Sequence, residues 1–95
     1  MKDFRYISQP GFTDTGMIFK FVQRSNEFIH TFAEGELLYT LGVNREDIVG
    51  KTLHDFYWDD IDTANLLNGY YKKAWAGQYI EYEGEFRGIY YVIYL

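Results

Sequence analysis

Apolar and polar residues alternate in two segments of the first half of the chain. In MIFKFVQ (17–23), Met17, Phe19 and Phe21 share one face and Lys20 marks the opposite face, which is the pattern of a half-buried strand. A short polar connection (24–27) leads into FIHTFA (28–33). Two such segments joined by a few polar residues predict an antiparallel hairpin.

The middle of the chain changes to the three- and four-residue spacing of helices. ELLYTL (36–41) ends at a glycine, and two short capped turns precede a longer helix predicted over 61–76. That helix carries one apolar stripe, with aspartates at its start and lysines near its end, as the helix dipole favours. Capping of the short turns is sufficient to explain Asp47 and Asp55.

The chain finishes with a second pair of predicted strands. QYIEYEGEF (78–86) alternates strictly, with glutamates on one face, and a tight Arg-Gly turn leads into IYYVIYL (89–95). The last segment is apolar on both faces, which is typical of a central or covered strand. Strands that bracket a group of helices predict an α+β domain with an antiparallel sheet and helices on one face.

One series of motifs resembles a known family. A strand running into a short helix, Gly42 after that helix, EDIVGK (46–51) and TLHDF (52–56) follow one another, and the helix exit AWAG and the strand YEGEF come later. In this order and spacing, residues 17–95 resemble a PAS domain, the sensory module of bacterial signalling proteins.

The resemblance implies a five-stranded antiparallel sheet of order 2-1-5-4-3, with short helices and one longer helix over one face. Only four of these strands are predicted within 17–95, so the fifth, central strand is expected to be missing and the domain to be truncated at its C-terminal end. Residues 1–16 are predicted to be an N-terminal segment or linker. An unpaired strand edge recruits other strands. Two hypotheses follow: the gap is filled by strand exchange with another chain, or by residues 2–8.

By resemblance, the function expected is that of a cytoplasmic sensor domain in a two-component or related signal-transduction protein. It would bind a small apolar or aromatic ligand, or a protein partner, and pass the signal to an output domain outside this chain. A homodimer or strand-exchanged oligomer is expected. The pocket candidates lie on the predicted inner faces of the helix and strands: Phe19, Phe21, Phe56, Leu67, Tyr71, Trp75, Tyr82 and Tyr91.

Two other functions remain open at this point. One is a ligand-free dimerisation or interaction module of the same fold. The other is a small α+β enzyme with a cone-shaped pocket, which would need His30, His54 or Asp55 to face that pocket with a shifted pKa. No catalytic residue is predicted, and a domain without enzymatic activity is expected.

Composition narrows the possible chemistry. The 95 residues are enough for one small domain, and 21% of them are aromatic. The net charge of -5 argues against nucleic acid and anionic membranes as partners, and no apolar run is long enough to span a membrane. The absence of cysteine excludes thiolate metal sites and cysteine-linked flavin. The resemblance would place a haem-binding histidine on the long helix, which has none, so neither flavin, haem nor a metal is expected.

Overall fold

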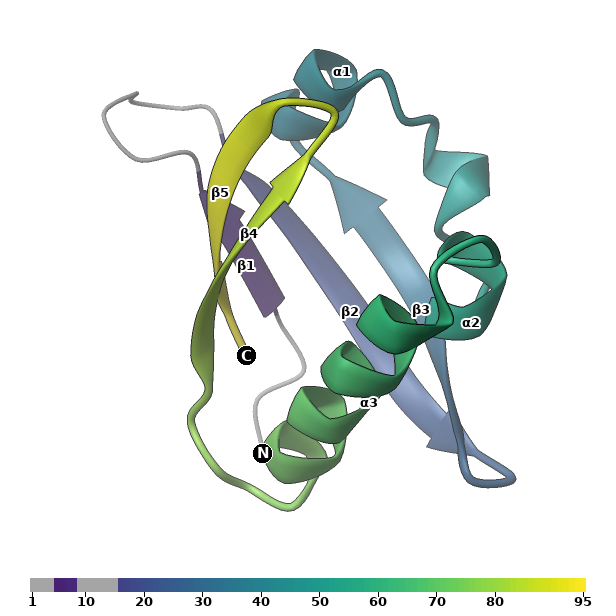
Figure 1. Ribbon diagram of the computed structural model, residues 1–95. Coiled ribbons are helices and arrows are strands. Elements are labelled where there is room, and N and C mark those ends of the chain that lie inside the picture. Colours follow the sequence, from purple (N-terminus) through teal and green to yellow (C-terminus); the bar gives the residue numbers. More distant parts are fainter. Residues whose placement is uncertain (1–4, 9–15) are drawn as a thin grey trace.

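The computed structural model describes the backbone of residues 5–8 and the whole of residues 16–95. It has an α+β architecture with two antiparallel hairpins and three α-helices (Figure 1). In chain order the elements are β1 (Arg5–Ser8), β2 (Met17–Arg24), β3 (Glu27–Glu34), α1 (Glu36–Leu41), the 3-10 turn η1 (Arg45–Asp47), α2 (Leu53–Phe56), α3 (Ile61–Trp75), β4 (Glu81–Phe86) and β5 (Ile89–Tyr94). Of the predicted segment 1–16, residues 1–4 and 9–15 lie outside the described residues.

The two hairpins, β2–β3 and β4–β5, do not pair with each other. Each pairs instead with β1, which runs antiparallel to β2 on one side and to β5 on the other (Figure 1). The order across the strands is therefore β3-β2-β1-β5-β4.

The predicted PAS-like sheet, of order 2-1-5-4-3 with its fifth strand missing from the chain, is wrong. The structure holds two separate hairpins, and the position between them is occupied by Arg5–Ser8 of the same chain. The sequence pattern failed here because a four-residue strand is too short to show alternation, and because its pairing joins distant parts of the chain. Residues 5–8 therefore lie where one hypothesis placed the segment 2–8, of which residues 2–4 are outside the described residues, and strand exchange with another chain stays a prediction.

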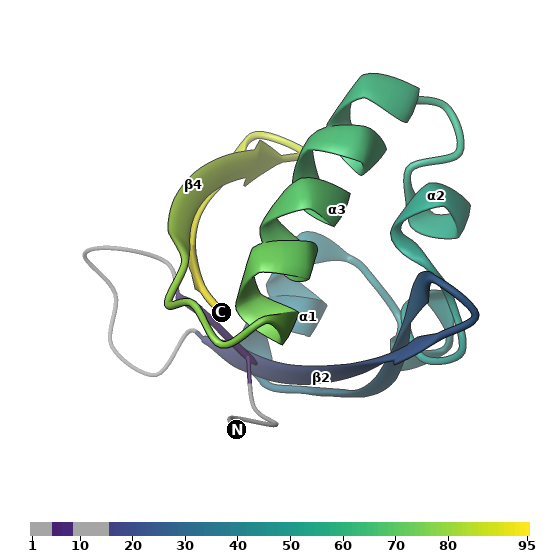
Figure 2. The ribbon, with the colours of Figure 1, turned by 90° about the horizontal axis from the view of Figure 1, so that it is seen from below.

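The helices lie together on one side of the strands, and α3 crosses the concave side of the curved β2 (Figure 2). Polar caps start the short helices. The backbone N–H of Thr52 donates to Asp55 Oδ2 (3.0 Å), and the N–H of Asp55 donates to Thr52 Oγ1 (3.1 Å). Asp47 accepts from the N–H of Asn44 in the same way (3.0 Å). The capping roles predicted for Asp47 and Asp55 are confirmed.

A close approach of two backbones positions α1 after β3. Gly35, at the junction, has φ 137° and ψ 163°, a conformation that is essentially restricted to glycine. The carbonyl of Gly16, just before β2, accepts a hydrogen bond from the N–H of Leu37 (3.1 Å). This contact lets the fully buried Leu37 enter the core.

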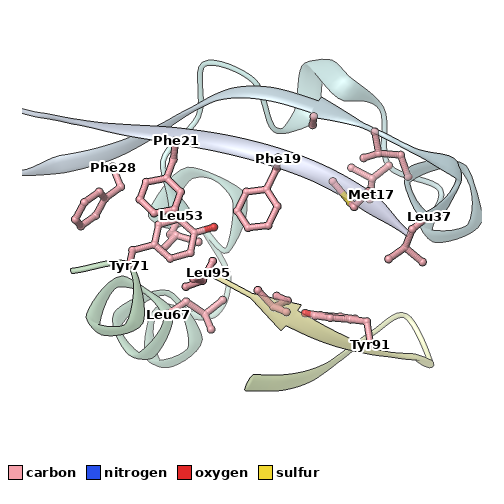
Figure 3. Packing of buried hydrophobic residues seen from close by; sticks show 14 of the residues in the cluster. Met17, Phe19, Phe21, Phe28, Leu37, Leu53, Leu67, Tyr71, Tyr91 and Leu95 are labelled. Carbon is pink, nitrogen blue, oxygen red and sulfur yellow. The ribbon is translucent and has the colours of Figure 1, made fainter. Parts of the chain in front are cut away.

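Stacked aromatic rings join α3 to the first hairpin. Phe19 and Phe21 extend from β2 toward Tyr71 of α3 (Figure 3), and the ring centroids of Phe21 and Tyr71 are 4.2 Å apart. Phe28 of β3 meets Phe21 edge to face at 5.5 Å. Aromatic residues bury a large area each, so a few of them fill this side of a small core. Within the described residues, no helix is long and apolar enough to cross a membrane.

Candidate functional site

Next to the aromatic cluster of Phe19, Phe21 and Tyr71, the core holds a pocket of about 80 Å³ between α3 and the strands. Residues from both hairpins, from α2 and from α3 line it. Six of the eight predicted pocket candidates are among the lining residues: Phe19, Phe56, Leu67, Tyr71, Tyr82 and Tyr91. The other two, Phe21 and Trp75, are absent from that lining and contact each other in the aromatic cluster, with ring centroids 6.2 Å apart.

The pocket lining is apolar apart from one histidine and four tyrosines. Among the described residues, no Lys, Arg, Asp or Glu lines it. Its polar groups are the imidazole of His30 and the hydroxyls of Tyr57, Tyr71, Tyr82 and Tyr91. An apolar cavity with a small number of convergent polar groups is the usual form of a ligand site.

His30 is held in one tautomer by two hydrogen bonds. Its Nδ1 lies 2.8 Å from the carbonyl oxygen of Lys51, which accepts only, so Nδ1 carries the hydrogen. Nε2 of the neutral ring is then an acceptor, and the Tyr71 hydroxyl, 2.8 Å away, donates to it. Burial lowers the pKa of His30, and the hydrogen bond to Lys51 opposes this shift. The ring is therefore neutral near pH 7 and keeps the pocket uncharged.

The lowered pKa of His30 predicts a loss of stability in mild acid. The unfolded chain takes up the proton at about pH 6.5, the ordinary value, before the folded chain does. The stabilising contribution is therefore complete above about pH 6.5 and is lost as the pH falls toward the lower folded pKa, with a slope of up to about 1.4 kcal/mol per pH unit. Urea unfolding between about pH 7.5 and pH 5 measures this slope.

Two variants separate His30 from the other titrating groups. His30→Gln is expected to flatten the slope, and His54→Gln to leave it unchanged, because His54 is exposed and hydrogen-bonds the side chain of Asn65 (2.9 Å) at the surface. Hydrogen bonds from Thr52 lower the pKa of Asp55 below its ordinary 3.8, so protonation of this carboxylate affects stability only at more acidic pH. An unchanged slope in His30→Gln would contradict the assignment.

The tyrosine hydroxyls form a second polar group in the pocket. A side-chain hydrogen bond between Tyr57 and Tyr91 raises the pKa of Tyr57 and lowers that of Tyr91. Burial is the largest cause of the raised pKa of Tyr57, and also of the raised pKa of Tyr82. The neighbouring Tyr71, Tyr91 and Tyr57 add to the shift of Tyr82, which places these hydroxyls around one space.

A glycine in β4 makes room for one of these rings. Gly84 is paired with Tyr91 of β5, and a Cβ atom built on Gly84 would lie 2.8 Å from the Tyr91 hydroxyl oxygen. A side chain at this position would displace the Tyr91 ring. Gly84 therefore fixes the place of one pocket hydroxyl.

The Phe56 and Phe86 rings separate the pocket from an open groove. Their centroids are 5.6 Å apart, and both residues, with Val43, line the pocket and the groove alike. On the groove side lie charged groups, including Lys51 and Arg87. Both aromatic side chains are half-buried. Phe56 and Phe86 therefore form part of the wall that the pocket shares with the groove.

Sequence reasoning did not place His30 or Tyr57 in the pocket. Tyr57 follows the last residue of α2, where no periodic pattern continues. For His30 a signal existed: it lies two positions after Phe28 in the predicted strand 28–33, and alternation puts both residues on the same face. Among the residues described, no group of three His, Cys, Asp or Glu side chains is placed to hold a metal.

Comparison of the chain with protein-family models, with curated proteins and with solved structures finds no match. The resemblance to PAS domains therefore stays a prediction from the motifs. Arguments about function rest on the pocket itself.

Proposed function

We propose that this chain is a sensory or regulatory domain that binds a small, largely apolar ligand in the pocket between α3 and the strands. The observation that carries the proposal is the pocket: side chains from both hairpins and two helices surround it, and six predicted ligand-site residues line it. The signal would pass to an output domain outside this chain. The proposal assigns no catalytic residue.

The proposed mechanism is a shift between two packings of α3. Leu67 and Tyr71 of α3 face Phe19 of β2 across the pocket region (Figure 3). A ligand that fits better when α3 stands slightly farther from the strands would favour that packing by its difference in affinity. Because Tyr71 also donates to His30 and stacks on Phe21, movement of α3 would change the positions of these two residues in β3 and β2.

Xenon is a suitable first probe, because it enters small apolar cavities without needing a hydrogen bond. Under xenon pressure, NMR shifts are expected at pocket methyl groups such as those of Leu67 and Val43, together with altered hydrogen exchange in α3. Leu67→Trp should abolish these shifts by filling the pocket. Leu66→Trp is the control, because Leu66 lies on the same helix with 57% of its surface exposed. Absence of shifts in the unmodified protein would refute the proposal.

A ligand-free interaction module is the second candidate, and the outer face of the strands favours it. Ile18 on β2 and Tyr90 on β5 are 38% and 44% exposed, as large apolar side chains at a binding surface would be. A dimer in light scattering that Ile18→Glu dissociates, combined with no xenon binding, would favour this candidate. The expected homodimer stays a prediction.

The enzyme alternative has less support. His30 does line the pocket and its pKa is shifted, as that alternative required. However, both of its ring nitrogens are engaged, with Lys51 and with Tyr71. Asp55 and His54 line the groove, outside the pocket.

A further inference from the structure

Tyr82 brings an unsatisfied hydroxyl to the pocket. Its ring is fixed by stacking on Tyr70 of α3, with centroids 4.7 Å apart. Tyr82 is half-buried and lines the pocket, and burial is the main cause of its raised pKa. Within residues 16–95 no hydrogen-bond partner is found for this hydroxyl, although other tyrosines lie around it. A hydroxyl in a pocket wall that has no protein partner can hydrogen-bond a ligand, as the few polar groups of an apolar ligand site do.

The other polar groups near Tyr82 are already committed to protein partners. The Tyr71 hydroxyl donates to His30, and the hydroxyls of Tyr57 and Tyr91 are hydrogen-bonded to each other. All of these groups are neutral, and no charged side chain of the described residues lines the pocket. A charged ligand would lose its hydration without gaining a counter-charge, which is strongly unfavourable.

From these observations we propose that the pocket selects a small neutral molecule bearing one hydrogen-bonding oxygen, an alcohol or ketone, whose oxygen bonds the Tyr82 hydroxyl. This inference rests on the proposed function and specifies its ligand class. Tyr82 is the residue that determines specificity, and the apolar lining holds the rest of the molecule.

The volume of the pocket limits the ligand's size. A cavity of about 150 Å³ holds benzene, so about 80 Å³ suits roughly three to five non-hydrogen atoms. The best tiny ligands reach a limiting free energy per atom that sets the tightest Kd at about 500 µM for three atoms and about 3 µM for five. A larger ligand would require Phe56 and Phe86 to move apart.

Three molecules of nearly the same shape test the proposal. 2-Butanone, propionate and 2-methyl-1-butene share one skeleton, in which a ketone oxygen, a carboxylate or a methylene group occupies the same place. Titrations followed by NMR of the whole chain give a Kd for each in the unmodified protein and in Tyr82→Phe. Tyr90→Phe is the control, because Tyr90 lies outside the pocket and bonds Glu83.

The ketone is expected to bind the unmodified protein and to lose about 2- to 12-fold in affinity in Tyr82→Phe, the worth of one hydrogen bond. The alkene should bind both proteins equally, and propionate neither. Melting should show that Tyr82→Phe is folded, since the lost hydroxyl has no partner in residues 16–95.

The outcomes separate the two claims. If xenon gives no shifts in the unmodified protein, the proposed function fails. If xenon binds but neither neutral probe does, the proposed ligand class fails alone. If the neutral probes bind but Tyr82→Phe weakens the ketone no more than the alkene, or if propionate binds as well as the ketone, only the ligand class proposed here is overturned.

Discussion

Replacing Gly35 by alanine is expected to destabilise the protein by about 2–5 kcal/mol. A Cβ at this position would lie 2.4 Å from the Gly16 carbonyl oxygen and 2.5 Å from the Cα of Met17, and both of these atoms belong to the backbone. Backbone cannot swing away as a side-chain end does, so β2 and α1 would have to separate. The φ of 137° adds strain of about 1–3 kcal/mol for any residue with a side chain, and overpacking adds a similar amount.

Two other glycines serve as controls for this variant. Gly50 also has a positive φ, 84°, but nothing lies within 4 Å of its added Cβ, so Gly50→Ala should show backbone strain alone. Gly69 lies inside α3 without a positive φ and is equally open, and Gly69→Ala should stabilise the protein by about 0.5–1 kcal/mol. Urea unfolding measures all three. A decrease of less than about 1 kcal/mol in the free energy of unfolding of Gly35→Ala would contradict this prediction, because it would show that the backbone at the junction can move to accept a side chain.

Phe21→Ala is expected to cost about 3–5 kcal/mol, the usual range for removal of a buried phenylalanine ring. Phe21 is 4% exposed and its ring contacts Tyr71 of α3 as well as Phe28. Loss of this ring would leave a cavity at the contact between α3 and the first hairpin. Chemical denaturation gives the change in free energy, and near-UV circular dichroism reports the loss of aromatic packing.

Phe32→Ala is the matched control for Phe21→Ala. Phe32 is on the neighbouring strand and 36% exposed, so its truncation should cost less than about 1 kcal/mol. Because Phe21 is not a lining residue, Phe21→Ala at a temperature where it is folded should still show the xenon shifts at the Leu67 and Val43 methyl groups, apart from any xenon held in the new cavity. If xenon binding is lost while the fold is kept, Phe21 belongs to the ligand site, as the sequence pattern predicted.

The local elements of this chain were predictable because their signals lie in neighbouring residues. The strand at 17–23, the helix at 36–41 and the Asp caps all appear where the pattern put them. Element ends were less exact: β4 begins at Glu81, although the alternation starts at 78. The three glutamates of β4 are exposed, as their shared face predicted.

Features set by long-range pairing were not predictable. The β2–β3 register shifts between Lys20 and Phe21, so Phe32 lies outside and Ala33 is fully buried, although strict alternation would put Phe32 on the same face as Phe28. The pocket also depends on long-range pairing. Apolar candidates could be named from periodicity. The roles of the Tyr82 hydroxyl and the His30 imidazole could not, because they depend on neighbouring groups that the fold brings from distant parts of the chain.

The central position of β1 also sets the order in which the protein assembles. Each hairpin forms between neighbouring residues, whereas Tyr6 meets Tyr94 only when the two ends of the chain come together. Closing so long a loop is entropically costly and slow, so we expect it to come last. The pocket is lined by Phe19 from one hairpin and by Tyr82 and Tyr91 from the other. The binding site therefore exists only once the two hairpins have been brought together, and ligand affinity arises only with that late step of folding.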